Sequence, residues 1–246
     1  MAPYAAPVPD LHDPLAAVAT LEGVPSALAA ARDGIDARLR DRGRRRTGPE
    51  VTTESLLLGA VATALLEGSA STPDDVRAGR GDGVAAGALR VSSELLGLLP
   101  VWRSSPVQAL ARLHALAADP DGGVEVGRPR SAEGAARLHA LGDRLREPTT
   151  APALAVAAVV HAEVAHAAAF GSVDGIVARS AERLVLVDRG VDPASVTVPE
   201  AGHAADPAAY RSALSAYGSG GTAGVTTWLL HAAQAFTRGA QAAPLP

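Results

Sequence analysis

The stretch Phe170-Gly171-Ser172-Val173-Asp174-Gly175-Ile176-Val177-Ala178-Arg179 decides how this chain is interpreted. It follows a long apolar segment, 151–168, and it opens a helical pattern that continues to residue 188. Successive backbone N–H groups at the start of a helix bind phosphate without help from side chains. The stretch therefore predicts two core helices joined by a loop that suits an anion.

Helical periodicity and capping signals recur along the rest of the chain. The only alternation typical of a strand is Val124-Glu125-Val126, so we expect any β structure near 123–130. The pattern predicts an all-α fold with short connections. The helices expected from capping residues and periodicity cover 24–40, 50–68, a short segment from 73, 85–99, 106–118, 131–146, 151–168, 175–188, 207–217 and 222–238.

Composition narrows the class of protein. Apolar residues make up 48% of the 246 residues but aromatic residues only 3%, so the core must be built from Ala, Val and Leu, which favours closely packed helices. Abundant Ala, Arg and Gly without Lys indicates a GC-rich bacterial genome, such as an actinobacterial one. The net charge of −4 argues against a nucleic-acid partner. The lack of Cys excludes disulfides, thiolate zinc sites and Cys nucleophiles.

Hydropathy gives no sign of a membrane partner. The sequence begins Met-Ala-Pro-Tyr, without the basic region and apolar core of a signal peptide. The longest apolar run, 151–162, contains Pro152 and His161 and is too short to span a bilayer. We therefore expect a soluble, cytoplasmic protein.

The spacing of Phe170, Gly175 and Arg179 resembles the signature of the Fic (Fido) family, His-Pro-Phe-x-Asp/Glu-Gly-Asn-Gly-Arg-x-x-Arg. Members of that family mostly transfer AMP from ATP to a protein hydroxyl. Leu113-His114, His161, the segment 210–214 and Trp228-Leu229 also follow the family's order, so the resemblance spans about 55–238. It implies a Fic-like helical bundle with a nucleotide site formed by Phe170, Gly171, Ser172, Val173, Asp174, Gly175 and Arg179.

Several positions depart from the family pattern. Ala168 stands where the catalytic His belongs, Ser172 replaces the acidic Mg²⁺ ligand, and Ile176 replaces the first Arg; Val173 and Asp174 replace a Gly and the Asn. Without the metal ligand and one Arg, a transferring phosphoryl group is poorly stabilised. We therefore assign no metal ligand, leave ATP as the ligand that the resemblance implies, and expect no standard AMP transfer.

Two histidines remain as candidates for the missing base. His166 lies about 200° around the helix from position 168, and His161 shares that face but lies about 10 Å away along the axis. Neither can be assigned as catalytic from sequence. The segment His161-Ala-Glu163-Val-Ala-His166 does not match a zinc protease helix, because a spacing of five puts the histidines about 140° apart. His203 is expected in a loop.

A second segment resembles the family's inhibitory helix, which reads Ser/Thr-x-x-x-Glu-Gly/Asn. The matching residues are Thr63, Glu67 and Gly68. The resemblance implies that Glu67 pairs with Arg179 and keeps the γ-phosphate of ATP misplaced. The alternative is a surface Glu before a glycine that ends a helix. We predict an ion pair between Glu67 and Arg179.

The family's β-hairpin flap, which aligns a target peptide, is short or absent here. Gly127-Arg128 is similar to the beginning of the Gly-x-x-Arg that precedes the flap, but a helix expected from Ser131 replaces the strand-forming residues. Docking of a protein substrate by strand addition is therefore not expected.

The chain divides into an irregular arm (1–22), N-terminal helices that include the inhibitory segment (23–82), a Fic-like core (83–240) and a short tail (241–246). The basic cluster at the end of the first long helix suits a solvated helix terminus better than a phosphate patch. Its members are Arg38, Arg40, Arg42, Arg44, Arg45 and Arg46.

Three functions remain open from the sequence. The favoured one is a degenerate Fic-fold protein that acts through residual binding of a nucleotide or phosphate, or through a protein partner. The second is a divergent enzyme that transfers AMP or another phosphate-containing group to a protein hydroxyl. The third is a helical domain that binds a small molecule. A homodimer fits any of them.

Overall fold

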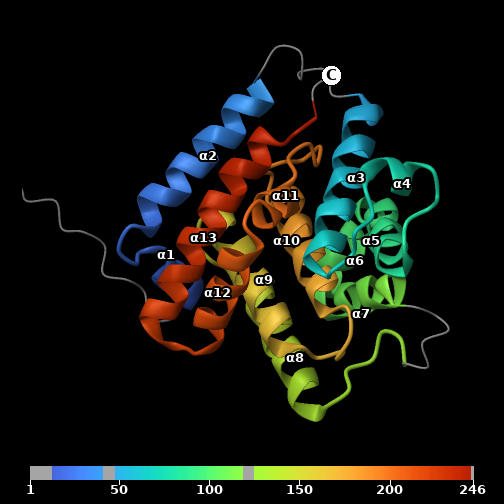
Figure 1. The fold of residues 1–246 in the computed structure, drawn as a ribbon. Helices are drawn as coiled ribbons and strands as arrows, with labels where there is room; N and C mark the ends of the chain where they lie inside the picture. Colours follow the sequence, from blue (N-terminus) through green and yellow to red (C-terminus); the bar gives the residue numbers. More distant parts are fainter. Residues whose placement is uncertain (1–12, 41–47, 119–124, 245–246) are drawn as a thin grey trace, which may run out of the picture.

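Two helices, α9 (Ala153–Ala167) and α10 (Asp174–Asp188), lie at the centre of the molecule (Figure 1). The loop 168–173, called the motif loop below, joins them. The computed structural model describes residues 13–40, 48–118 and 125–244, and over these residues the fold is all-α, as predicted. The other helices are α1 (Pro14–Ala19), α2 (Val24–Arg40), α3 (Pro49–Leu66), α4 (Pro73–Arg77), α5 (Gly83–Glu94), the 3₁₀ helix η2 (Leu96–Leu98), α6 (Leu99–Ser104), α7 (Pro106–Ala117), α8 (Ala132–Arg146), α11 (Pro199–Ala204), α12 (Pro207–Gly218) and α13 (Gly221–Gln241).

The two central helices are buried on nearly every side because other helices surround them. In α9 the side chains from Leu154 to Ala162 are all buried, and in α10 those from Ile176 to Val187 are buried. Figure 1 shows α2 and α13 on one side of this pair and α3, α5 and α7 on the other. A helix that is apolar all round belongs in a core, which explains why α9 lacks a polar face.

One buried ion pair fastens α10 to α3 and α11. Arg183 donates to both carboxylate oxygens of Glu200, at 2.8 and 2.5 Å, and also to the hydroxyls of Ser55 and Ser195. A buried guanidinium needs this full set of acceptors to offset its desolvation. Gly59 on α3 leaves room for the pair, since a Cβ there would lie 2.8 Å from Arg183 Nη2.

The segment expected to be one helix over 85–99 is instead three. Helix α5 ends at Glu94, η2 follows, and α6 begins at Leu99 with Pro100 in its first turn. Pro fits there because the first turn of a helix needs no N–H donor. No single described helix is long and apolar enough to cross a bilayer. Helix α5 and the η2–α6 segment, which form a bent pair, have the necessary length and apolarity only when they are taken together.

One further expectation needs correction, because His203 lies in helix α11 and is fully buried, not in a loop. The segment 123–130, where β structure was expected if the chain had any, shows no strand over 125–130, and 123–124 lie outside the described residues. Arg42, Arg44, Arg45 and Arg46 of the basic cluster also lie outside them, whereas Arg38 and Arg40 end α2.

Helix α11 packs against α13 through Gly202, whose missing side chain lets the helices touch. A Cβ at this position would overlap the backbone carbonyl of Ala235, which cannot rotate away. We predict that Gly202→Ala lowers the free energy of unfolding by about 1–3 kcal/mol, as overpacking does. The control is Gly34→Ala on α2, where no atom lies within 4 Å; it should raise stability by about 0.5–1 kcal/mol. Urea unfolding measures both, and equal effects would contradict the packing argument.

Candidate functional site

The loop between α9 and α10 begins and ends on residues with left-handed backbones. Ala168 ends α9 with φ 41°, and Val173 precedes α10 with φ 49°. Such conformations are uncommon for residues other than Gly and persist where the surroundings impose them. Ala168, which the resemblance places at the position of the family's catalytic His, is exposed at the edge of this loop.

The carboxylate of Asp174 turns back into the loop. Its Oδ1 accepts a hydrogen bond of 3.0 Å from the N–H of Phe170, and it also faces the N–H groups of Gly171 and Ser172. Burial raises the pKa of Asp174, and these N–H groups oppose that rise. Asp174 is the first residue of α10 and Val173 its N-cap. The donors predicted to bind phosphate therefore face an acceptor from the chain itself.

His114, on α7, supports the loop from beneath. Its ring stacks on Phe170 with centroids 4.4 Å apart, and its Nε2 lies 3.2 Å from Ser172 Oγ. Because Nδ1 accepts a hydrogen bond from the N–H of Gly127, the neutral ring carries its proton on Nε2 and donates it to Ser172. Burial lowers the pKa of His114, which favours this neutral form. In this tautomer His114 cannot accept a proton from Ser172.

Arg179 lies almost wholly inside the protein, with 1% of its side chain exposed, and its partners come from α3 and α12. Nη2 is 2.6 Å from Glu67 Oε1, which confirms the predicted ion pair. Nε donates to Thr63 Oγ1 at 3.3 Å, and Nη1 donates to Tyr210 Oη at 2.9 Å. Thr63 as well as Glu67 thus contacts Arg179, although the resemblance to an inhibitory helix implied only the pairing with Glu67.

Gly175 allows Glu67 to reach this position. A Cβ at residue 175 would overlap Oε1 of Glu67 and would lie 3.1 Å from Arg179 Nη2. Glu67 is the C-cap residue of α3, and Gly68 follows it with φ 92°. The two glycines therefore serve the ion pair in different ways: Gly68 ends the helix, and Gly175 makes room for the carboxylate.

The sequence interpretation missed one cation beside the loop. The side chain of Arg130 lies across Gly171, where a Cβ would be 2.7 Å from its Cδ. Its backbone N–H donates to the carbonyl of Ala169 at 2.8 Å. Arg130 is exposed and forms no ion pair with any described residue. The spacing Gly127-x-x-Arg130 is the signal in the sequence that indicates this residue, whereas Arg128 lies near Glu125.

The two remaining histidine candidates do not lie at the loop surface. His161 is fully buried, and its Nε2 lies 3.0 Å from Tyr210 Oη, so an attacking hydroxyl in solvent cannot reach it. Burial lowers the pKa of His161 to about 4. His166 is exposed, and its ring lies beside Gly218 at the end of α12. The loop thus has backbone N–H donors that face Asp174 and two nearby arginines, but no base beside Ala168 among the described residues.

The role of Asp174 can be separated from its charge. We predict that Asp174→Ala lowers the free energy of unfolding by about 1–2 kcal/mol, because the N–H of Phe170 loses its acceptor. Asp174→Asn should cost clearly less, since the amide oxygen can still accept while the negative charge near Glu67 is removed. Chemical denaturation of the two variants measures the difference. Equal losses for both would show that charge, and not the hydrogen bond, holds the loop.

Comparison with known proteins connects this geometry to a fold. No protein-family model and no curated protein matches the sequence. Among solved structures, a Fic family protein from Desulfovibrio desulfuricans G20 superposes with a TM-score of 0.76 at 18% identity, over 91% of this chain and 74% of that one. Fic-1 (residues 134–508) from C. elegans gives a TM-score of 0.64 at 17% identity, over 89% of this chain and 72% of that one. The chain therefore has the Fic fold.

Proposed function

We propose that this protein is a Fic-fold pseudoenzyme that binds a nucleotide or another phosphate ligand at the 170–175 loop, under the control of Glu67, and does not transfer AMP. The observation that carries the proposal is the ion pair of 2.6 Å between Glu67 and the buried Arg179. A carboxylate placed on the cation of an anion site is an internal competitor for any ligand that needs that cation.

Two arginines, Arg179 and Arg130, support the proposal that the anion site is retained. Arg179 is held by Thr63 and Tyr210 as well as by Glu67, so its guanidinium stays in place if Glu67 leaves. Beside Gly171, Arg130 adds a second guanidinium, which has no ion pair among the described residues. Guanidinium groups and helix N-terminal N–H groups are the donors that phosphates bind best in proteins.

The case against transfer rests on the missing proton acceptor. A base must lie within hydrogen-bond reach of the hydroxyl that it activates. Ala168 cannot serve, His114 already donates its proton to Ser172, and His161 is buried. Ser172 also offers no carboxylate for Mg²⁺. A phosphate ligand bound here would meet neither the base nor the metal that AMP transfer needs.

A protein partner fits as the agent that moves Glu67. The end of α3 carries Leu65, whose side chain is 51% exposed although it is large and apolar. Leu65 lies two residues before Glu67, about 200° around the helix, so a partner that covers Leu65 would act on Glu67 through the backbone of their shared turn. Removal of Glu67 would turn an occupied cation into a free one, and binding at Leu65 would couple to binding at the loop.

Calorimetric titration of ATP, with and without Mg²⁺, tests the nucleotide site. We predict little or no binding to the wild type and binding at least about tenfold tighter to Glu67→Ala, because Arg179 is then free to contact the phosphates. The control is Glu54→Ala on the same helix, whose side chain pairs with the exposed Arg77; it should behave as the wild type does.

The double variant Glu67→Ala/Arg179→Met should lose the binding gained by Glu67→Ala, provided that circular dichroism shows a folded protein. If neither the wild type nor Glu67→Ala binds ATP with or without Mg²⁺, the nucleotide part of the proposal is wrong, and binding of a protein partner becomes the function to test.

Lack of transfer is tested separately. We predict that the wild type and Glu67→Ala, incubated with labelled ATP and Mg²⁺, label neither themselves nor added bacterial proteins, because none of the described residues places a base beside Ala168. Mass spectrometry for an AMP adduct is the measurement. An adduct on either variant would establish a divergent enzyme and overturn the pseudoenzyme proposal.

A further inference from the structure

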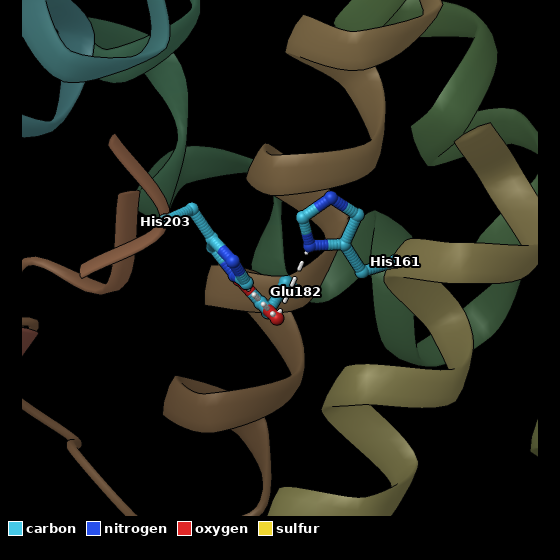
Figure 2. Close-up of side chains that lie close together, drawn as sticks. All are labelled: His161, Glu182 and His203. Atoms are coloured by element: carbon cyan, nitrogen blue, oxygen red, sulfur yellow. Dashed lines mark hydrogen bonds and ion pairs between the residues drawn. The ribbon is translucent and has the colours of Figure 1, made fainter. Parts of the chain in front are cut away.

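Two histidines and a glutamate from three different helices converge in the core, away from the 170–175 loop. His161 of α9, Glu182 of α10 and His203 of α11 are each fully buried, and Figure 2 shows both rings directed at the carboxylate. His161 Nδ1 lies 3.2 Å from Glu182 Oε1, and His203 Nε2 lies 3.0 Å from Glu182 Oε2. The three donor atoms all lie within 4.8 Å of one another.

The contacts within the cluster leave a polar atom unsatisfied. His161 Nδ1 is buried and forms no hydrogen bond, because its contact with Glu182 has ion-pair distance but not hydrogen-bond alignment. Buried polar atoms in folded proteins almost always have a partner. A ring nitrogen that faces a carboxylate without bonding to it is consistent with both atoms pointing at a third one.

The charge of Glu182 also lacks an arginine. The two guanidinium groups nearest in sequence on α10 bind other carboxylates: Arg179 binds Glu67, and Arg183 binds Glu200. A buried carboxylate is costly unless it is paired with a cation. A divalent cation between Glu182 and the two imidazoles would supply that charge.

In both rings, the nitrogen that points away from Glu182 already has a hydrogen-bond partner. His161 Nε2 lies 3.0 Å from Tyr210 Oη, and His203 Nδ1 lies 3.2 Å from His231 Nε2. Ligating histidines in metalloproteins usually donate their second N–H to such a partner, which fixes the tautomer and the ring orientation. Here each ring can keep its proton on the outer nitrogen and turn a lone pair toward Glu182.

We propose that His161, Glu182 and His203 bind one structural Zn²⁺ ion in the core. Two imidazole nitrogens and carboxylate oxygens form a donor set that suits Zn²⁺. Both oxygens of Glu182 face ring nitrogens, so a bidentate carboxylate completes four-coordination without water. The nitrogens need to approach to about 3.3 Å, the edge of a tetrahedron with Zn–N distances of about 2.0–2.1 Å.

The ion would join α9, α10 and α11, and a single side chain, that of Tyr210, would connect its ligand His161 to Arg179. Tyr210 Oη contacts both His161 Nε2 and Arg179 Nη1. Zinc on His161 keeps its Nε2 proton in place, which orients the Tyr210 hydroxyl and through it the guanidinium of Arg179. The inference does not depend on the proposed nucleotide binding, because the ligands and the test are separate from the loop.

The test uses the full chain and Zn²⁺ itself. The protein is expressed with added zinc, purified without a metal-affinity tag, and analysed for metal by elemental mass spectrometry. Because the site is fully buried, the apoprotein is made by unfolding in denaturant with a chelator and refolding with Co²⁺ or with no metal. We expect about one ion per chain, a visible Co²⁺ spectrum of four-coordinate type, and a higher unfolding temperature with metal than without.

Glu182→Gln keeps the shape of the side chain and should lose the ion and the Co²⁺ spectrum. The matched control, His139→Ala, removes an exposed histidine of α8 that bonds only within its own helix, and it should bind metal as the wild type does. If Glu182→Gln fails to fold, the wild type alone decides. Metal-free protein with an unfolding temperature unchanged by Zn²⁺ or Co²⁺ during refolding would overturn the proposal, as would retention of one ion by folded Glu182→Gln.

Discussion

The buried guanidinium of Arg179 constrains more of this structure than any other group. It lies at 1% exposure between three helices, so its position on α10 requires acceptors from α3 and α12. Thr63, Glu67 and Tyr210 supply them. The position of Glu67 depends on two further features. Residue 175 must lack a Cβ, and α3 must end at Leu66 so that Glu67 can turn inward. The burial of one charge thus fixes the relative position of three helices and of the motif loop.

Two carboxylates near Arg179 also determine when the proposed site is free to bind a ligand. The loop offers backbone donors and Arg179 offers a guanidinium group, but Asp174 faces the donors and Glu67 pairs with the guanidinium. Two carboxylates so close together repel each other, and the raised pKa of Asp174 reflects this along with its burial, which is the larger cause. A site that holds its own anions is stable without a ligand and is available to a ligand only when one carboxylate moves. We regard this as the physical basis for the proposed control by Glu67.

Below the loop, the core is polar to an unusual degree for so apolar a chain. The chain of contacts runs from Glu67 through Arg179 and Tyr210 to His161, and then from Glu182 through His203 to His231. Trp228 packs among these rings and donates its N–H to the carbonyl of Ala158. Two of the seven Phe, Trp and Tyr residues of the sequence, Tyr210 and Trp228, lie at this point and pack against the histidine rings.

The resemblance of two short segments to family motifs, and no local signal, implied the pairing of Glu67 with Arg179. The sequence by itself determined the helical class and the position of most helices, through capping residues and apolar periodicity. It did not reveal that Asp174 folds back on Phe170, that Arg130 lies over Gly171, or that His203 meets Glu182 and His161 from a helix. Only the tertiary structure decided these contacts. Some join residues far apart along the chain and others depend on the conformation of a loop, and helical periodicity predicts neither. Local chemistry specifies elements, whereas the partners of a buried charge are set by how those elements pack.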